Sequence, residues 1–122
     1  MQKPPNTRGH LQDILLAIEN CFKFTQTQNF DEFLFDEKTN SATIYQLLII
    51  GEATKRLDEN FRKQHDEVPW KDMTGMRDVL IHFYHGVDYG EVWRTVEEDL
   101  PILKSQIEKI ISRMDKTSGE KQ

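Results

Sequence analysis

The chain has a single cysteine, Cys21, and so it cannot form an intrachain disulfide. This lack favours a reducing compartment, and we expect the protein to be cytoplasmic. Long hydrophobic runs are missing as well. The longest, residues 14–18 and 47–50, are far shorter than the roughly 20 apolar residues that a membrane-spanning helix needs. Residues 1–8 hold two prolines and no apolar segment, so we expect neither a signal peptide nor a membrane partner.

Metal and cofactor motifs are also absent from the sequence. The four histidines, at positions 10, 65, 82 and 85, form no H-x3-H or His-Glu-x-x-His pair, and we therefore expect no metal site. There is no glycine-rich phosphate loop and no Gly-x-Ser-x-Gly turn, so we predict no cofactor. Cys21 has no neighbouring base and lies beside an apolar stripe, which indicates a buried packing residue and not a nucleophile.

Positive charge is scarce. The chain carries 16 Lys and Arg residues against 21 Asp and Glu residues, a formal net charge of −5. This balance argues against binding nucleic acid through bulk electrostatics, but it allows a small basic active site or RNA contacts shared across an oligomer. It also suits contact with a basic partner. The length of 122 residues indicates one domain over residues 1–122, with flexible ends at about 1–7 and 115–122.

What the sequence does have is helical periodicity. Its apolar residues recur at intervals of three and four, and no stretch alternates with the period of two expected of a strand. The first stripe predicts a helix that begins near Thr7 or Arg8, and it consists of Leu11, Ile14, Leu15, Ile18 and Phe22. Further patterns predict a short helical segment over residues 30–35, a long helix over 42–65 and a helix over 70–84.

Capping residues mark the ends of these elements. Asn40 or Ser41 is the expected N-cap of the long helix, and Asp88 that of the segment after residue 84. Gly86 is expected to stop the helix that precedes it.

Pro101 fits poorly inside a helix, so we expect a kink there, or a break with Asp99 as a new N-cap. A last apolar stripe follows over residues 103–114. Short loops between long amphipathic helices predict an all-α, up-and-down bundle of four to five helices.

The densest functional chemistry lies in residues 76–85, where Arg77, His82 and Tyr84 follow the spacing R-x4-H-x-Y. A guanidinium binds phosphate through a planar fork of donors, and an imidazole transfers protons near neutral pH. A phenol is a nucleophile or the acceptor of a modifying group. Together they indicate a site for a phosphodiester or a nucleotide. From composition alone, a partly buried helical His82 and a core aromatic Tyr84 are the commoner interpretation.

The same spacing limits what one helix can do. On an ideal helix Arg77 and Tyr84 share a face about 10 Å apart, whereas Arg77 and His82 point about 140° away from each other. One straight helix therefore cannot bring Arg77 and His82 together. A distorted helix end near Gly86 can do so, and so can a dimer that apposes two copies of the helix.

With its surroundings, this pattern resembles the HEPN domains, and in particular the HepT-like toxins that are encoded beside a minimal nucleotidyltransferase. The resemblance covers nearly the whole chain, and the motifs that carry it are Phe30-Asp31-Glu32-Phe33, Ile50-Gly51-Glu52-Ala53, Pro69-Trp70, Gly75-Met76-Arg77, Ile81-His82, Gly86-Val87-Asp88, Trp93 and Asp99-Leu100-Pro101. Two positions depart from the usual pattern. Asp78 stands where Asn is common, which bears on activity, and Phe83 stands where an acidic or small residue is common, which bears on packing.

Gly51 interrupts the predicted long helix, and Glu52 follows it directly. A glycine inside a helix costs about 1 kcal/mol relative to alanine, which is tolerable where another helix approaches closely. An exposed helical Glu is most often only solvated. The resemblance implies the alternative, a Glu52 carboxylate that orients Arg77 or His82.

The resemblance also implies an activity, that of a homodimeric, metal-independent endoribonuclease that cleaves tRNA or mRNA. In it Arg77 would hold the phosphate and His82 would transfer a proton, with Asp78, Glu52 and Tyr84 in support. The family's toxins belong to type VII toxin–antitoxin systems. A minimal nucleotidyltransferase antitoxin of the MntA type would neutralise this toxin by AMPylation of Tyr84.

A second function remains open at this point. The chain can be a non-catalytic substrate-binding or regulatory partner subunit of a nucleotidyltransferase, with Tyr84 as its modified residue. The two functions separate if the purified, unmodified protein never cuts RNA. A small nucleotidyltransferase in the neighbouring reading frame would favour the toxin.

Overall fold

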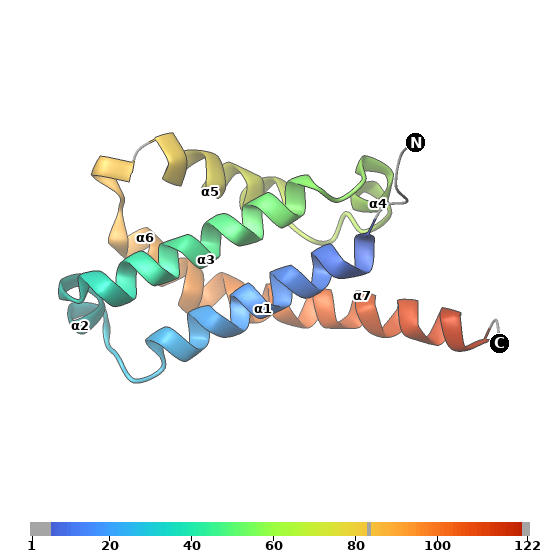
Figure 1. Ribbon diagram of the computed structural model, residues 1–122, viewed down its shortest axis with the longest axis horizontal. Helices are drawn as coiled ribbons and strands as arrows, with labels where there is room; N and C mark the ends of the chain where they lie inside the picture. Colours follow the sequence, from blue (N-terminus) through green and yellow to red (C-terminus); the bar gives the residue numbers. More distant parts are fainter. Residues whose placement is uncertain (1–5, 83, 121–122) are drawn as a thin grey trace.

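The computed structural model describes residues 6–82 and 84–120, with the side chains of all of these except 84 and 118–120. Four long helices form the molecule: α1 (Thr7–Thr25), α3 (Glu37–Lys55), α5 (Trp70–His82) and α7 (Leu100–Glu120). Figure 1 shows that successive long helices run in opposite directions. The described ranges contain no strand, and the predicted all-α, up-and-down bundle is confirmed.

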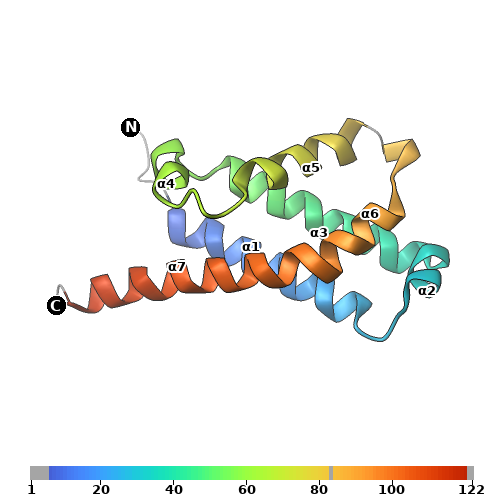
Figure 2. The same cartoon turned by 180° about the vertical axis from the view of Figure 1, so that it is seen from behind.

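Short elements close the ends of this bundle. Seen from behind, α2 and α4 lie at opposite ends, and α6 leads directly into α7 (Figure 2). These elements are α2 (Phe30–Phe35), α4 (Glu59–Gln64), α6 (Tyr89–Arg94), a 3-10 turn (Tyr84–Gly86) and a π-helical turn (Thr95–Asp99). The predicted short helix over 30–35 and the Asp88 cap are both confirmed, since the Asp88 side chain accepts a hydrogen bond from the Glu91 backbone N–H.

Helix α1 supplies much of the core, because its apolar stripe packs against α3 and α7. Leu11, Ile14 and Ile18 are fully buried, and each such side chain stabilises the fold by about 1.5–3 kcal/mol. Cys21 is fully buried on the same helix, and burial raises the pKa of its thiol to about 12. The prediction of a buried cysteine is confirmed.

The predicted bounds of the long helix, residues 42–65, are wrong at both ends. Helix α3 begins at Glu37, because the Asp36 carboxylate caps it by accepting a hydrogen bond from the Thr39 backbone N–H at 3.1 Å. Asn40, one of the two expected caps, is buried inside the helix, and its amide donates to the Phe33 carbonyl at 3.2 Å. This contact ties α2 to α3.

At its other end α3 stops at Lys55, and α4 is a separate helix. The Trp70 indole nitrogen donates to the carbonyls of Arg62 and His65, at 3.2 and 2.9 Å, and so fastens the end of α4 to the start of α5. Periodicity alone did not reveal the break, because apolar residues on both sides of it keep helical spacing.

A wide π-helical turn over residues 95–99 leads into α7 just before Pro101. Pro101 has no N–H to donate and takes the second position of α7, where that loss is tolerated. Asp99 does not serve as the expected N-cap, since its carboxylate lies 3.0 Å from the Arg94 guanidinium in an ion pair. Helix α7 continues to Glu120, so residues 115–120 have helical backbone, and their flexibility stays a prediction.

Helix α5 ends at His82, earlier than the expected residue 84. Phe83 lies outside the described residues, and Gly86 is part of a 3-10 turn without a positive φ, so it does not act as a left-handed helix cap. None of the helices over residues 6–82 and 84–120 is long and apolar enough to cross a membrane.

Candidate active site

The candidate site lies where α3 and α5 touch, and Gly51 makes that contact close. A Cβ atom at position 51 would overlap the Cβ of Arg77 and would lie 3.0 Å from the Met73 carbonyl oxygen. Only glycine therefore allows the two backbones to come this near. The expectation that another helix approaches Gly51 is confirmed, and the approach places Arg77 beside Glu52.

Arg77 is held by carboxylates from both helices. Its Nε donates to the Glu52 Oε1 of α3, and its Nη1 donates to Asp78 Oδ1 at 2.9 Å. The same Asp78 oxygen accepts a hydrogen bond from Lys55 Nζ at 3.1 Å. Two acids and two bases thus alternate in one network, in the order Glu52, Arg77, Asp78, Lys55.

The hydrogen bonds of this network favour the charged forms of Arg77 and Asp78. The hydrogen bond to Asp78 and then that to Glu52 raise the pKa of Arg77 above its ordinary value. In return, the hydrogen bonds from Arg77 and Lys55 hold the pKa of Asp78 below its usual range. The Arg77 side chain is 24% exposed, so it reaches solvent without being freely mobile. No described residue accepts a hydrogen bond from its Nη2 group, which leaves this edge of the guanidinium available to an anion.

His82 lies apart from this network. It is the last residue of α5, and its side chain is exposed. No hydrogen bond or ion pair joins His82 to Arg77, Asp78 or Glu52, all of which are described. In one copy of the chain, therefore, no hydrogen bond or ion pair links Arg77 to His82 among the described residues, and the two point to different sides of an ideal helix.

The side chain of Tyr84 lies outside the described residues. Its backbone belongs to the 3-10 turn and not to α5. Arg77 and Tyr84 were expected to share one face of a continuous helix. This expectation is wrong, because α5 ends at His82 and Tyr84 begins a 3-10 turn.

Lys55 is the residue that sequence reasoning missed. Its signal was present, because Lys55 stands three positions after Glu52 on the same helix, a spacing that places side chains on one face. What the sequence could not show was that Asp78 of α5 would face this pair.

The network lies on an open surface. The cavity of about 780 Å³ between α5 and α6 is lined by other residues of α5, including Met76, Val79 and Leu80. Among the described residues, no three of His, Cys, Asp and Glu gather in a way that could hold a metal ion. The site offers a fixed cation and carboxylates on a surface that a long substrate or a second chain can cover.

Comparison with known proteins places this chain among relatives that share most of its length. A probable ribonuclease HepT of Thermococcus cleftensis is 48% identical over 103 residues, which are 84% of this chain and 94% of that protein. Two proteins of Methanocaldococcus jannaschii that are named as candidate RNases are 42% and 38% identical, over 90% and 84% of this chain and 91% and 94% of theirs. No solved structure matches the chain significantly.

The family profile described as "Ribonuclease HepT-like" matches residues 14–110, a range that includes Glu52, Arg77 and His82. The match agrees with the resemblance found in the motifs, and it spans α1 to most of α7. The chain therefore belongs to the HepT-like ribonuclease family.

Proposed function

We propose that this protein is a homodimeric endoribonuclease in which Arg77 binds the scissile phosphate of RNA and His82 transfers a proton. The observation that carries the proposal is the setting of Arg77. Its guanidinium is oriented by Glu52 and Asp78, held in the charged form, and has its Nη2 edge unused by any described residue. A fixed guanidinium with free donors is suited to the equatorial oxygens of a phosphate.

The reaction we propose uses the RNA's own hydroxyl group. The ribose 2′-oxygen attacks the adjacent phosphorus, so a 2′-O–P bond forms and the bond from phosphorus to the 5′-oxygen of the next nucleotide breaks. The 2′-hydroxyl loses a proton and the leaving 5′-oxygen gains one, and His82 performs one of these transfers. Arg77 stabilises the charge that develops on the non-bridging oxygens. The products are a 2′,3′-cyclic phosphate and a 5′-hydroxyl.

A dimer would bring one Arg77 and one His82 together in a shared site. Because Arg77 and His82 of one copy are not joined, we propose that α5 helices of two copies face each other, so that Arg77 of one chain acts with His82 of the other. Exposed apolar side chains beside these residues support the arrangement: Val79 is 55% exposed and Ile81 is 44% exposed. A contiguous exposed apolar patch with a polar rim is one mark of a protein interface, and a facing α5 would cover Val79 or Ile81.

We further propose that the enzyme is the toxin of a toxin–antitoxin pair. A minimal nucleotidyltransferase antitoxin would transfer AMP from ATP to the Tyr84 hydroxyl: the phenolic oxygen forms a bond to the α-phosphorus and loses its proton, and pyrophosphate leaves. The added nucleotide would bring a negative phosphate and a bulky adenosine to the end of α5. The negative phosphate would repel the RNA backbone, and the adenosine would block the path of RNA.

The proposal is tested by incubating purified, unmodified protein with labelled RNA, both with EDTA and without it. We expect cleavage in both samples and fragments that end in 2′,3′-cyclic phosphate. The absence of cleavage by well-folded protein would refute the proposal and would favour a non-catalytic partner subunit of the nucleotidyltransferase. Cleavage that EDTA abolishes, or fragments with 5′-phosphate ends, would refute the mechanism.

A further inference from the structure

Asp78 is shared by two cations. Its Oδ1 accepts from Arg77 Nη1 at 2.9 Å and from Lys55 Nζ at 3.1 Å. The other acid of the network, Glu52, contacts Arg77 from the opposite helix. Lys55 is therefore tied to the proposed phosphate-binding residue through Asp78 alone.

The charges in this network sum to zero only if Lys55 is counted. Arg77 and Lys55 contribute two positive charges, and Glu52 and Asp78 contribute two negative ones. Without Lys55 the group around Arg77 would carry a net negative charge. A phosphate that approaches Arg77 would then meet more repulsion than attraction, since charges within a few ångströms of each other are only partly screened by water.

We propose that Lys55 is a positioning residue of the RNA site, which neutralises Asp78 and so leaves the Arg77 charge available to a phosphate. This inference rests on the proposed ribonuclease function. Lys55 acts through Asp78 and need not touch RNA itself. Its effect is on substrate binding more than on the chemical step, because it changes the electrostatic field at the phosphate and contributes no proton.

A purely structural role for Lys55 does not fit its exposure. The side chains of Lys55 and Asp78 are 42% and 49% exposed. Ion pairs in such positions contribute little to folding, since water screens them and both side chains lose conformational freedom. Removal of Lys55 is therefore expected to leave the bundle folded.

Lys55 should affect RNA binding only while residue 78 carries a negative charge. An asparagine at position 78 can accept the same hydrogen bond from Arg77 but carries no charge that needs a counter-ion. The substitutions Lys55→Gln and Asp78→Asn should then be coupled, because in the Asp78→Asn variant no carboxylate holds Lys55 beside Arg77, and its loss should change the field at the phosphate less. A double-mutant cycle measures such coupling directly.

The experiment measures kcat and KM for RNA cleavage with the wild type, Lys55→Gln, Asp78→Asn and the double variant, at low ionic strength. We expect Lys55→Gln to raise KM about fivefold with kcat nearly unchanged, as is typical of a charge at the edge of a binding site. Asp78→Asn should change KM by less than about twofold in the same cycle. The double variant should resemble Asp78→Asn, and added salt should shrink the effect of Lys55→Gln.

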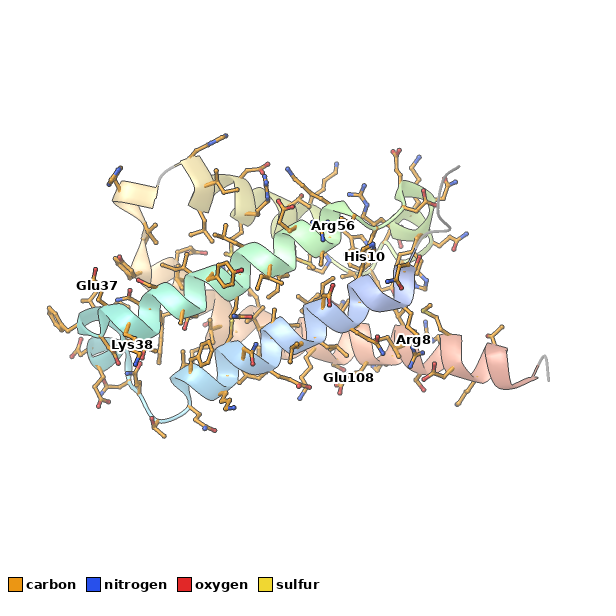
Figure 3. The ribbon with its side chains drawn as sticks, in the orientation of Figure 1. Arg8, His10, Glu37, Lys38, Arg56 and Glu108 are labelled. Atoms are coloured by element: carbon orange, nitrogen blue, oxygen red, sulfur yellow. The ribbon has the colours of Figure 1, made fainter. Side chains whose placement is uncertain are left out.

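Arg56→Gln is the matched control. Arg56 lies next to Lys55 at the end of α3 (Figure 3), and its removal changes the net charge equally without touching Asp78. A KM for Arg56→Gln equal to that of Lys55→Gln would reduce the effect to bulk charge and overturn the inference. Additive effects in the double variant, or no effect of Lys55→Gln, would overturn it as well. If wild-type protein does not cleave RNA, the proposed function fails and this inference fails with it.

Discussion

Arg77 lies at the contact between α3 and α5, and one carboxylate from each helix balances its charge. The family resemblance implied that the Glu52 carboxylate orients Arg77 or His82, and in the structure it accepts a hydrogen bond from Arg77 Nε. Asp78 follows Arg77 directly in the chain and also binds it. Lys55 was not foreseen, because its contact joins residues that are 23 positions apart and depends on the register of α3 against α5.

Arg77→Ala and His82→Ala should each lower RNA cleavage by at least about 100-fold, because the first removes the phosphate ligand and the second the proton-transfer group. Neither variant should unfold the bundle, since both side chains reach solvent. Arg56→Ala and His10→Ala are the matched controls. Figure 3 shows these two residues at the other end of the α1–α3 pair from Glu37 and Lys38. Full activity of a folded Arg77 or His82 variant would contradict the assigned roles.

Tyr84→Phe removes the proposed AMP acceptor but keeps the aromatic ring, so the fold should survive. We expect wild-type protein to gain mass in whole AMP units after co-expression with the neighbouring nucleotidyltransferase, and Tyr84→Phe to gain none. Intact-protein mass spectrometry gives the answer. If the hydroxyl is only an acceptor, the variant should remain toxic in the presence of an active antitoxin. Equal modification of both proteins would exclude Tyr84 as the acceptor.

At the scale of helices, the sequence predicted their existence more reliably than their ends. The stripe of α1 is unambiguous, because Leu11, Ile14 and Ile18 are buried in the core and the partly buried Leu15 and Phe22 pack against it. The ends of α3 depended on contacts that periodicity does not encode. These are the capping of its first turn by Asp36 and the fastening of α4 by Trp70. A kink or a capped break was expected near Pro101. The structure instead has a π-helical turn over residues 95–99.

Gly51→Ala should destabilise the protein by about 1–2 kcal/mol, even though alanine favours a helix by about 1 kcal/mol over glycine. The added methyl group would overlap the Cβ of Arg77, and α3 and α5 would have to move apart. Chemical denaturation measures the change. Gly75→Ala is the control on α5, since a Cβ there meets no atom within 4 Å, and it should be neutral or stabilising. Equal effects of the two substitutions would contradict the close-approach account of Gly51.

At the scale of the whole molecule, the sequence predicted one all-α bundle but could not show how its site is completed. Arg77 packs against α3, while His82 is exposed at the last residue of α5. Their separation follows from helix geometry and was foreseen. The surface that we propose for the partner chain could not be predicted in detail, because it depends on which apolar side chains remain exposed after folding, such as Val79 and Ile81.

The protein should be a dimer at micromolar concentration. The exposed side chains of Val79 and Ile81 favour association of two chains. The proposed action of Arg77 from one chain with His82 from another also needs a dimer. Light scattering after size-exclusion chromatography gives the mass, to be compared with 14.4 kDa for one chain. Ile81→Glu should shift the protein toward the monomer and reduce cleavage in parallel, whereas Glu108→Lys, an exposed change on α7, should do neither. A wild type that is strictly monomeric would refute the shared site.

The central claim is that Arg77 of one chain acts with His82 of another, and mixed dimers test it most directly. Arg77→Ala and His82→Ala chains are each expected to be inactive alone. When they are unfolded together and refolded as a mixture, half of the dimers should hold one chain of each kind. Each such dimer would contain one intact Arg77–His82 pair, so about a quarter of wild-type RNA cleavage should return. A mixture that forms mixed dimers but remains as inactive as its components would contradict the account.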